Sequence, residues 1–160
     1  MKLQRIVWLA ALMLVLGRPT VARAQTPSAT ITMPAGVSFS VSNVSQSVTG
    51  SPGPFRIVFS TKNINGNANF YVSVKADTVN FAGPGTTRSP ASKVSWTATP
   101  IGGGTGSPGT LSSAAYSQVY VTGNNKSGSI DITWTLASIA AAGLRAGTHT
   151  LTVRYRLEAF

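Results

Sequence analysis

One pattern limits the folds open to this chain: apolar and hydroxyl side chains alternate over most of its length. Successive side chains of a β-strand point to opposite faces of the sheet, so a two-residue period predicts strands that are buried on one face. The other faces are mostly Ser and Thr, which strands tolerate in contact with water. The alternation is found in the stretches ATITM, VSFSVS, PFRIVFS, NFYVSVKA, KVSWTAT, SQVYVT, SIDITWTL and HTLTVRYRL.

Turn-forming residues separate these stretches. The sequence GSPG occurs twice, at 50–53 and 106–109, and Pro followed by Gly suits a type II turn. The glycine-rich segment TPIGGGTGSPGT is expected to form a long flexible loop, and residues 138–147 are the one segment expected to hold a helical turn. Seven or eight short strands at this spacing predict an all-β fold, a two-sheet antiparallel sandwich of the immunoglobulin-like (Ig-like) kind.

Each sheet of such a sandwich hides one face, and the apolar positions of the strands predict the core. Trp96 and Trp134 lie on the apolar side of their strands, so we expect them in the core and not as stacking platforms for sugars. The predicted core residues are Phe39, Phe55, Ile57, Phe59, Phe70, Val72, Val74, Val94, Trp96, Val119, Val121, Ile130, Ile132, Trp134, Leu136, Leu151, Val153, Tyr155 and Leu157.

The first 24 residues have the features of a signal peptide. Lys2 and Arg5 precede the apolar run IVWLAALMLVL, and Ala22 and Ala24 fit a small-residue cleavage site. The run is too short for a membrane-spanning helix, which needs about 20 residues. We therefore expect cleavage after residue 24 and a single sandwich domain over 25–160. The protein is then exported to the periplasm, the cell surface or the medium, and does not span the membrane after cleavage.

Charge and cysteine content limit the partners. Residues 25–160 contain nine basic and three acidic side chains, and the basic ones are scattered along the chain. Such an excess favours anionic partners such as acidic polysaccharide, or it simply aids solubility. Candidate contacts to an anionic surface are Lys75, Arg154 and Arg156, and export argues against nucleic acid as the partner. The chain has no cysteine, which excludes thiol catalysis, zinc–thiolate sites and iron–sulfur clusters.

Residues suited to catalysis are scarce. His149 is the only histidine, and the only side-chain carboxylates belong to Asp77, Asp131 and Glu158. If the last two strands form a hairpin, Asp131 faces Arg154 and lies roughly 13 Å from Glu158, too far for the paired carboxylates of a glycosidase. We therefore expect a cross-strand ion pair between Asp131 and Arg154. We expect the protein to bind no metal and no cofactor and to have no enzymatic activity. A hydrolase that combines His149 with Asp77 or Asp131 is a distant third candidate function, behind the structural module and the carbohydrate-binding module described below.

The closing segment, LRAGTHTLTVRYRLEAF, resembles the last strand of secreted bacterial Ig-like domains of the pilin and spore-coat-subunit type. Those subunits usually carry a disulfide, which this chain lacks. The resemblance implies a non-enzymatic structural or adhesive module that binds protein partners or self-associates at an edge strand. It would also allow donor-strand exchange, in which the N-terminal arm QTPSATITM fills a neighbour's missing strand. We favour the alternative that this arm is the domain's own first strand.

The competing function is a carbohydrate-binding module. Tyr71, Tyr116 and Tyr120 fall on polar strand faces or in loops, so they are the candidates for an exposed stacking surface. Such a surface would bind a neutral or an anionic polysaccharide. An exposed coplanar pair of rings would favour this function over the structural one.

Overall fold

The computed structural model describes residues 28–62, 69–123, 127–139 and 144–159. The predicted signal peptide lies outside these ranges, and so do residues 140–143 of the expected helical turn. The elements are β1 (Ser28–Thr32), β2 (Val48–Thr49), β3 (Phe55–Lys62), β4 (Phe70–Ala76), η1 (a 3₁₀ turn, Ala91–Lys93), β5 (Val94–Ile101), β6 (Thr105–Gly106), β7 (Gly109–Thr110), β8 (Ser117–Val121), β9 (Ser127–Leu136) and β10 (Val153–Ala159).

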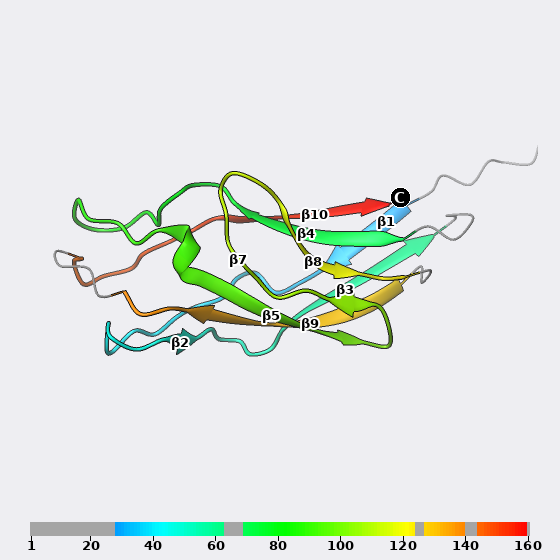
Figure 1. Ribbon diagram of the computed structural model, residues 1–160, viewed down its shortest axis with the longest axis horizontal. Coiled ribbons are helices and arrows are strands. Elements are labelled where there is room, and N and C mark those ends of the chain that lie inside the picture. The colour runs from blue at the N-terminus through cyan, green and yellow to red at the C-terminus, as the bar shows by residue number, and fades with distance from the viewer. Residues whose placement is uncertain (1–27, 63–68, 124–126, 140–143, 160) are drawn as a thin grey trace, which may run out of the picture.

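These strands form two antiparallel sheets that pack on one another (Figure 1). The larger sheet has the order β1-β3-β9-β5-β7, with β2 also paired to β9, and the smaller has the order β10-β4-β8-β6. The predicted all-β class and two-sheet antiparallel sandwich are confirmed. Within the described ranges, no helix has the length and apolar character that crossing a membrane requires.

Strand β1 answers the question about the N-terminal arm. Residues Ser28–Thr32 pair antiparallel with β3 of the same chain, and Ile31 lies opposite Phe59. The arm therefore serves as the sandwich's own first strand over these residues, the alternative favoured above.

The core lies between the two sheets. Ile57, Val72, Val74, Ile130 and Ile132 have no exposed surface, because each lies on the inward parity of a strand covered by the other sheet. The other predicted core residues that are buried are Phe55, Phe59, Phe70, Val94, Trp96, Val119, Trp134 and Leu136. Six residues predicted in the core are only half-buried: Phe39, Val121, Leu151, Val153, Tyr155 and Leu157.

A β-bulge in β8 reverses the expected parity of its last residues. Val72 lies opposite Tyr120 but the next residue, Ser73, lies opposite Gln118, so Val119 is an extra residue in β8. An extra residue lets two neighbours point to the same side of the sheet. Val119 and Tyr120 are accordingly both buried, at 0% and 1% exposure. The prediction that Tyr120 is exposed is therefore wrong.

The glycine-rich segment after β5 is not one long loop. Its two short strands join different sheets, since β6 pairs with β8 and β7 pairs with β5. The Trp96 indole N–H donates to the carbonyl oxygen of Ser107 at 2.8 Å, and the Tyr120 hydroxyl donates to that of Gly103 at 2.6 Å. These two bonds from buried side chains hold the segment against the sandwich.

Candidate functional site

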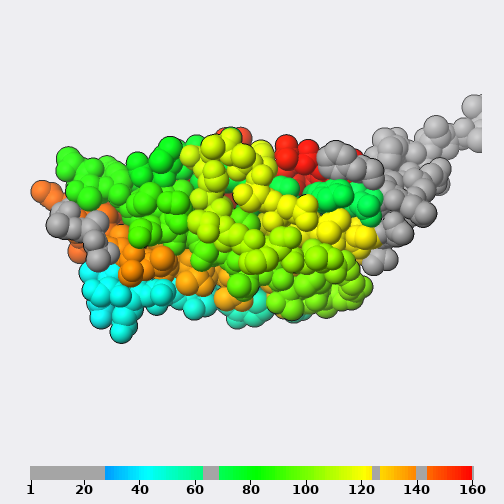
Figure 2. All heavy atoms as spheres, viewed as in Figure 1, coloured from blue at the N-terminus to red at the C-terminus, as the bar shows by residue number. Residues whose placement is uncertain are grey.

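Strand β10 leaves one edge of the smaller sheet unpaired. Among the described residues it pairs only with β4, and it lies along the upper margin of the molecule in Figure 1, where its atoms (red) also appear in Figure 2. The Asp77 amide donates to the carbonyl oxygen of Thr152, and this bond shows which residues of β10 direct their backbone groups to β4. Since directions alternate along a strand, the amides of Arg154 and Arg156 also point to β4. The backbone groups of Val153, Tyr155 and Leu157 point to the open edge.

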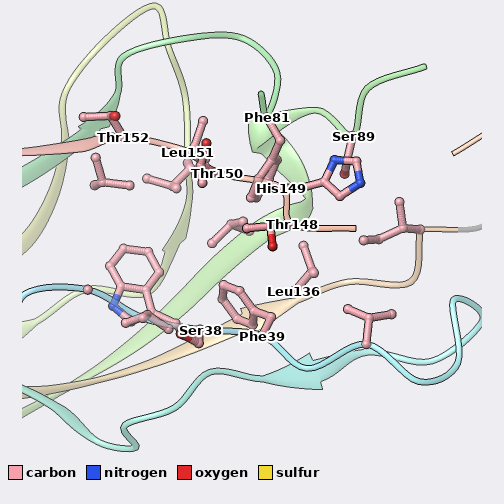
Figure 3. A pocket seen from close by; sticks show the side chains of 18 of the residues that line it. Ser38, Phe39, Phe81, Ser89, Leu136, Thr148, His149, Thr150, Leu151 and Thr152 are labelled. Atoms are coloured by element: carbon pink, nitrogen blue, oxygen red, sulfur yellow. The ribbon is translucent and has the colours of Figure 1, made fainter. Parts of the chain in front are cut away.

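A wide groove opens beside this edge, between the segment that follows β1 and the segment that leads into β10. Figure 3 shows the two walls, with Phe39 on one and His149 and Leu151 on the other, and Leu136 at the floor. The groove has a volume of about 1010 Å³. Its floor and walls are mainly apolar and include Met33, Val37, Phe39, Phe55, Trp134, Leu136, Ile139, Leu144, Leu151, Val153 and Tyr155.

Several polar atoms in the groove's lining lack partners. Ser89 Oγ, Trp134 Nε1 and His149 Nδ1 are buried and make no hydrogen bond within the described part of the chain. His149 Nε2 lies 2.9 Å from the carbonyl oxygen of Arg145, which can only accept, so Nε2 carries the proton and Nδ1 of the neutral ring is an acceptor. Burial also raises the pKa of the Tyr155 phenol. A buried polar atom without a partner costs stability, and these three atoms belong to residues that line the groove.

A second candidate surface is the outward face of the smaller sheet. Three of the predicted residues meet there, since the Arg156 guanidinium lies 4.2 Å from the centre of the Tyr116 ring and the Lys75 ammonium 5.8 Å from it. Arg154 lies directly opposite Lys75 in the ladder, so it shares this face. The residues predicted to contact an anionic surface thus gather around one aromatic ring.

The same face also carries two carboxylates, which reduce its positive charge. Arg154 binds Asp77 through two hydrogen bonds, and Arg156 lies 2.8 Å from Glu158. The hydrogen bond from Arg154 holds the pKa of the Asp77 carboxyl below its usual value. Lys75 makes no ion pair with a carboxylate in the described part of the chain.

The three tyrosines proposed for stacking do not form one platform. Tyr120 lies in the core and packs against Phe59, with ring centroids 5.5 Å apart. Tyr71 lies opposite Glu158 on the outward face of β4, and the Tyr116 ring contacts Arg156 and Lys75. Only Tyr71 and Tyr116 remain as candidates for contact with a sugar.

The predicted ion pair between Asp131 and Arg154 is wrong. Strands β9 and β10 do not form a hairpin, because β9 belongs to the larger sheet and β10 to the smaller. Asp131 lies opposite Arg56 of β3 and accepts two hydrogen bonds from it, at 2.7 and 2.8 Å. The stronger influence on the Asp131 pKa is the hydrogen bond from Arg56, which lowers it. The prediction assumed that strands adjacent in the sequence pair with each other. Only the strand order in the sheets identifies Arg56 as the partner of Asp131.

The residues considered for catalysis are dispersed. Asp77 and Asp131 each bind an arginine, and the groove that His149 lines contains neither of them. Within the described ranges there is no group of three or more metal-ligating side chains. The arrangement therefore offers two binding surfaces: a groove beside an open strand edge, and a basic face with one aromatic ring. These residues do not form an acid–base pair.

Comparison of the chain with protein-family models, with curated proteins and with solved structures finds no match. The geometry of the two surfaces is therefore the basis for a functional proposal.

Proposed function

We propose that this protein is an exported, non-enzymatic interaction module of the cell surface or periplasm, which binds an extended segment of a partner protein along β10. The observation that carries the proposal is the open edge of β10 beside the apolar groove. The signal-like N-terminus supports export, and the resemblance of the closing segment to pilin-type subunits supports a structural or adhesive role.

An extended peptide matches both halves of this surface. Its backbone can pair with the outward N–H and C=O groups of Val153, Tyr155 and Leu157, as in other complexes formed by strand addition. Its alternate side chains can then enter the groove, because successive side chains of a strand point to opposite faces. A long open edge without an occupant is a site of aggregation, which proteins generally block.

The occupant is a partner's segment and not residues 28–32 of the same chain, because those residues already pair with β3. The groove is also lined on its far wall by residues 33–39, which continue directly from β1. The segment that follows the chain's own first strand therefore forms one wall of the groove and leaves the space beside β10 to another molecule.

The test uses mature protein, residues 25–160, and a synthetic peptide of about nine residues in which Val and Ile alternate with Thr. On binding, hydrogen exchange should slow at the amides of Val153, Tyr155 and Leu157, whereas those of Arg154 and Arg156, already directed to β4, serve as internal references. A peptide of the same composition with the alternation scrambled is the control. Absence of binding, or protection confined to β1, would overturn the proposal.

A matched pair of variants separates the groove from general surface effects. Leu151→Lys places a charge in the groove wall and should abolish peptide binding, since Leu151 lines the groove. Val79→Lys adds the same charge at an apolar residue that is 64% exposed and lies outside the groove, so it should leave binding unchanged. Equal loss in both variants would count against the groove.

A second candidate function is binding of an acidic polysaccharide on the outward face of the smaller sheet. It is favoured by one observation, the convergence of Arg156 and Lys75 on the Tyr116 ring. A carboxylated sugar could bind the cations while its ring contacts Tyr116 or Tyr71. This face is separate from the groove, so the two functions do not exclude each other.

A further inference from the structure

At one end of the groove, two of its lining residues, Arg145 and His149, pack on a turn formed by Gly83, Pro84 and Gly85, which also holds Arg88. Arg88 donates to the carbonyl oxygens of Gly83 and Pro84, the latter at 3.1 Å. The side chain of Arg145 packs against Gly85, where an added Cβ would lie 3.0 Å from its Cγ.

The imidazole of His149 packs on the same turn, at Gly83. Arg145, His149 and Ser89 also line the groove, and Figure 3 shows the His149 ring beside Ser89 at this end. Two guanidinium groups and an imidazole therefore lie around one turn, and of these three groups Arg145 and His149 line the groove.

No carboxylate side chain of this chain is left to balance these groups. The sequence contains only three acidic residues, and each has an arginine partner elsewhere: Asp77 with Arg154, Asp131 with Arg56, and Glu158 with Arg156. The charges of Arg88 and Arg145 are therefore uncompensated by any Asp or Glu. An apolar groove with a cationic end suits a ligand that is apolar along its length and anionic at one end.

We propose that the segment bound along β10 carries a carboxylate that lies at the Arg145 end of the groove. The inference rests on the proposed function and specifies the chemistry of the partner. The carboxylate approaches Arg145, whose side chain is exposed and lines the groove. It comes from an Asp or Glu side chain or from the segment's own C-terminus, since both present the same group to a guanidinium.

The experiment compares four peptides of the alternating design on mature protein. One has both ends blocked and no acidic residue; two have blocked ends and a single Asp, at the first or the last position; the fourth has a free C-terminal carboxylate. At low salt, the peptides that place a carboxylate at the Arg145 end should bind roughly five- to tenfold more tightly than the neutral one. The advantage should shrink as salt is raised.

Variants assign the effect to Arg145. Arg145→Gln should remove the advantage of the acidic peptides over the neutral one, and Arg145→Lys should retain most of it. Arg145 is exposed, so neither change threatens the core. Lys62→Gln, at a basic residue of β3 outside the groove, is the matched control for loss of one positive charge.

The outcomes are distinguishable from a failure of the proposed function. Equal binding of all four peptides, with protection along β10, would overturn the carboxylate inference and leave strand binding intact. Binding of none of them would overturn both. If a medium-chain fatty acid binds with dependence on Arg145 and the peptides do not, the groove is a lipid site, and both proposals are wrong.

Discussion

Phe55 of β3 and Tyr155 of β10 stack across the two sheets, with ring centroids 6.1 Å apart and ring planes 6° apart. Offset stacking of this kind contributes beyond the burial of the two rings alone. Both residues also line the groove, so the contact joins the open edge of the smaller sheet to the larger one. The pair is therefore one link between the proposed binding edge and the larger sheet, beside the ladder that joins β10 to β4.

Removing the Tyr155 ring should loosen β10. Tyr155→Ala is expected to lower the free energy of unfolding by about 1–3 kcal/mol, the lower part of the range for large-to-small changes, because the residue is only half-buried. Tyr155→Phe keeps the stack and should cost well under half as much. Urea unfolding followed by tryptophan fluorescence measures the unfolding free energy of both variants. An equal loss of unfolding free energy in the two would show that the hydroxyl, and not the ring, is responsible.

The Tyr155 phenol should make the protein less stable in alkali. Burial raises its pKa in the folded protein, so the unfolded chain loses this proton first, beginning near pH 10. Stability that is fully present below that pH is then lost as the pH rises toward the folded pKa. The comparison is the unfolding free energy of the parent and of Tyr155→Phe between pH 8 and pH 11. The parent should fall more steeply above about pH 10, and parallel curves would contradict the assignment.

A double-mutant cycle should detect coupling between Arg56 and Asp131 and none between Arg154 and Asp131. The hydrogen bonds from Arg56 lower the Asp131 pKa, so the stabilisation exists above the unfolded carboxyl pKa, near pH 4, and disappears as the pH falls through the folded value. Unfolding of Arg56→Ala, Asp131→Ala, Arg154→Ala and the two double variants at pH 7 and at low pH provides the measurement. Coupling between Asp131 and Arg154 would instead support a hairpin of the last two strands.

Gly109 should tolerate no side chain. A Cβ at this position would overlap the indole of Trp96, which is 2% exposed and held by its hydrogen bond to Ser107. Overpacking of this kind typically costs about 1–3 kcal/mol, so Gly109→Ala should lower the melting temperature. Gly36→Ala is the control, because a Cβ there meets no atom within 4 Å, and it should change stability little.

Tyr116 should decide whether the outward face binds acidic polysaccharide. If it does, Tyr116→Ala and Lys75→Gln should each weaken retention on immobilised polygalacturonate, because the ring and the ammonium both contact the ligand in that proposal. Lys93→Gln removes a charge from η1, which leads into β5 of the larger sheet, and should leave retention unchanged. Equal loss in all three variants would indicate attraction by net charge alone.

The candidate sites were only partly predictable. Arg154 and Arg156 share a strand face by their spacing, and the sequence places both with the polar residues. That Lys75 and Tyr116 join them depends on β4 and β8 lying beside β10, and those pairings join residues far apart in the chain. The groove could not be predicted at all, since its two walls come from residues 33–44 and 144–155.

The sequence by itself determined the strands and most of their inward faces, because the pleat makes side chains alternate and burial requires apolar residues on one parity. Phe55, Ile57 and Phe59 are buried for this reason. Only the tertiary structure decided which strands pair, since β9 lies between β3 and β5 and β10 beside β4. It also decided the bulge that turns Tyr120 inward and the half-burial of β10. Strand pairing depends on contacts between distant segments, which a local two-residue pattern leaves undetermined.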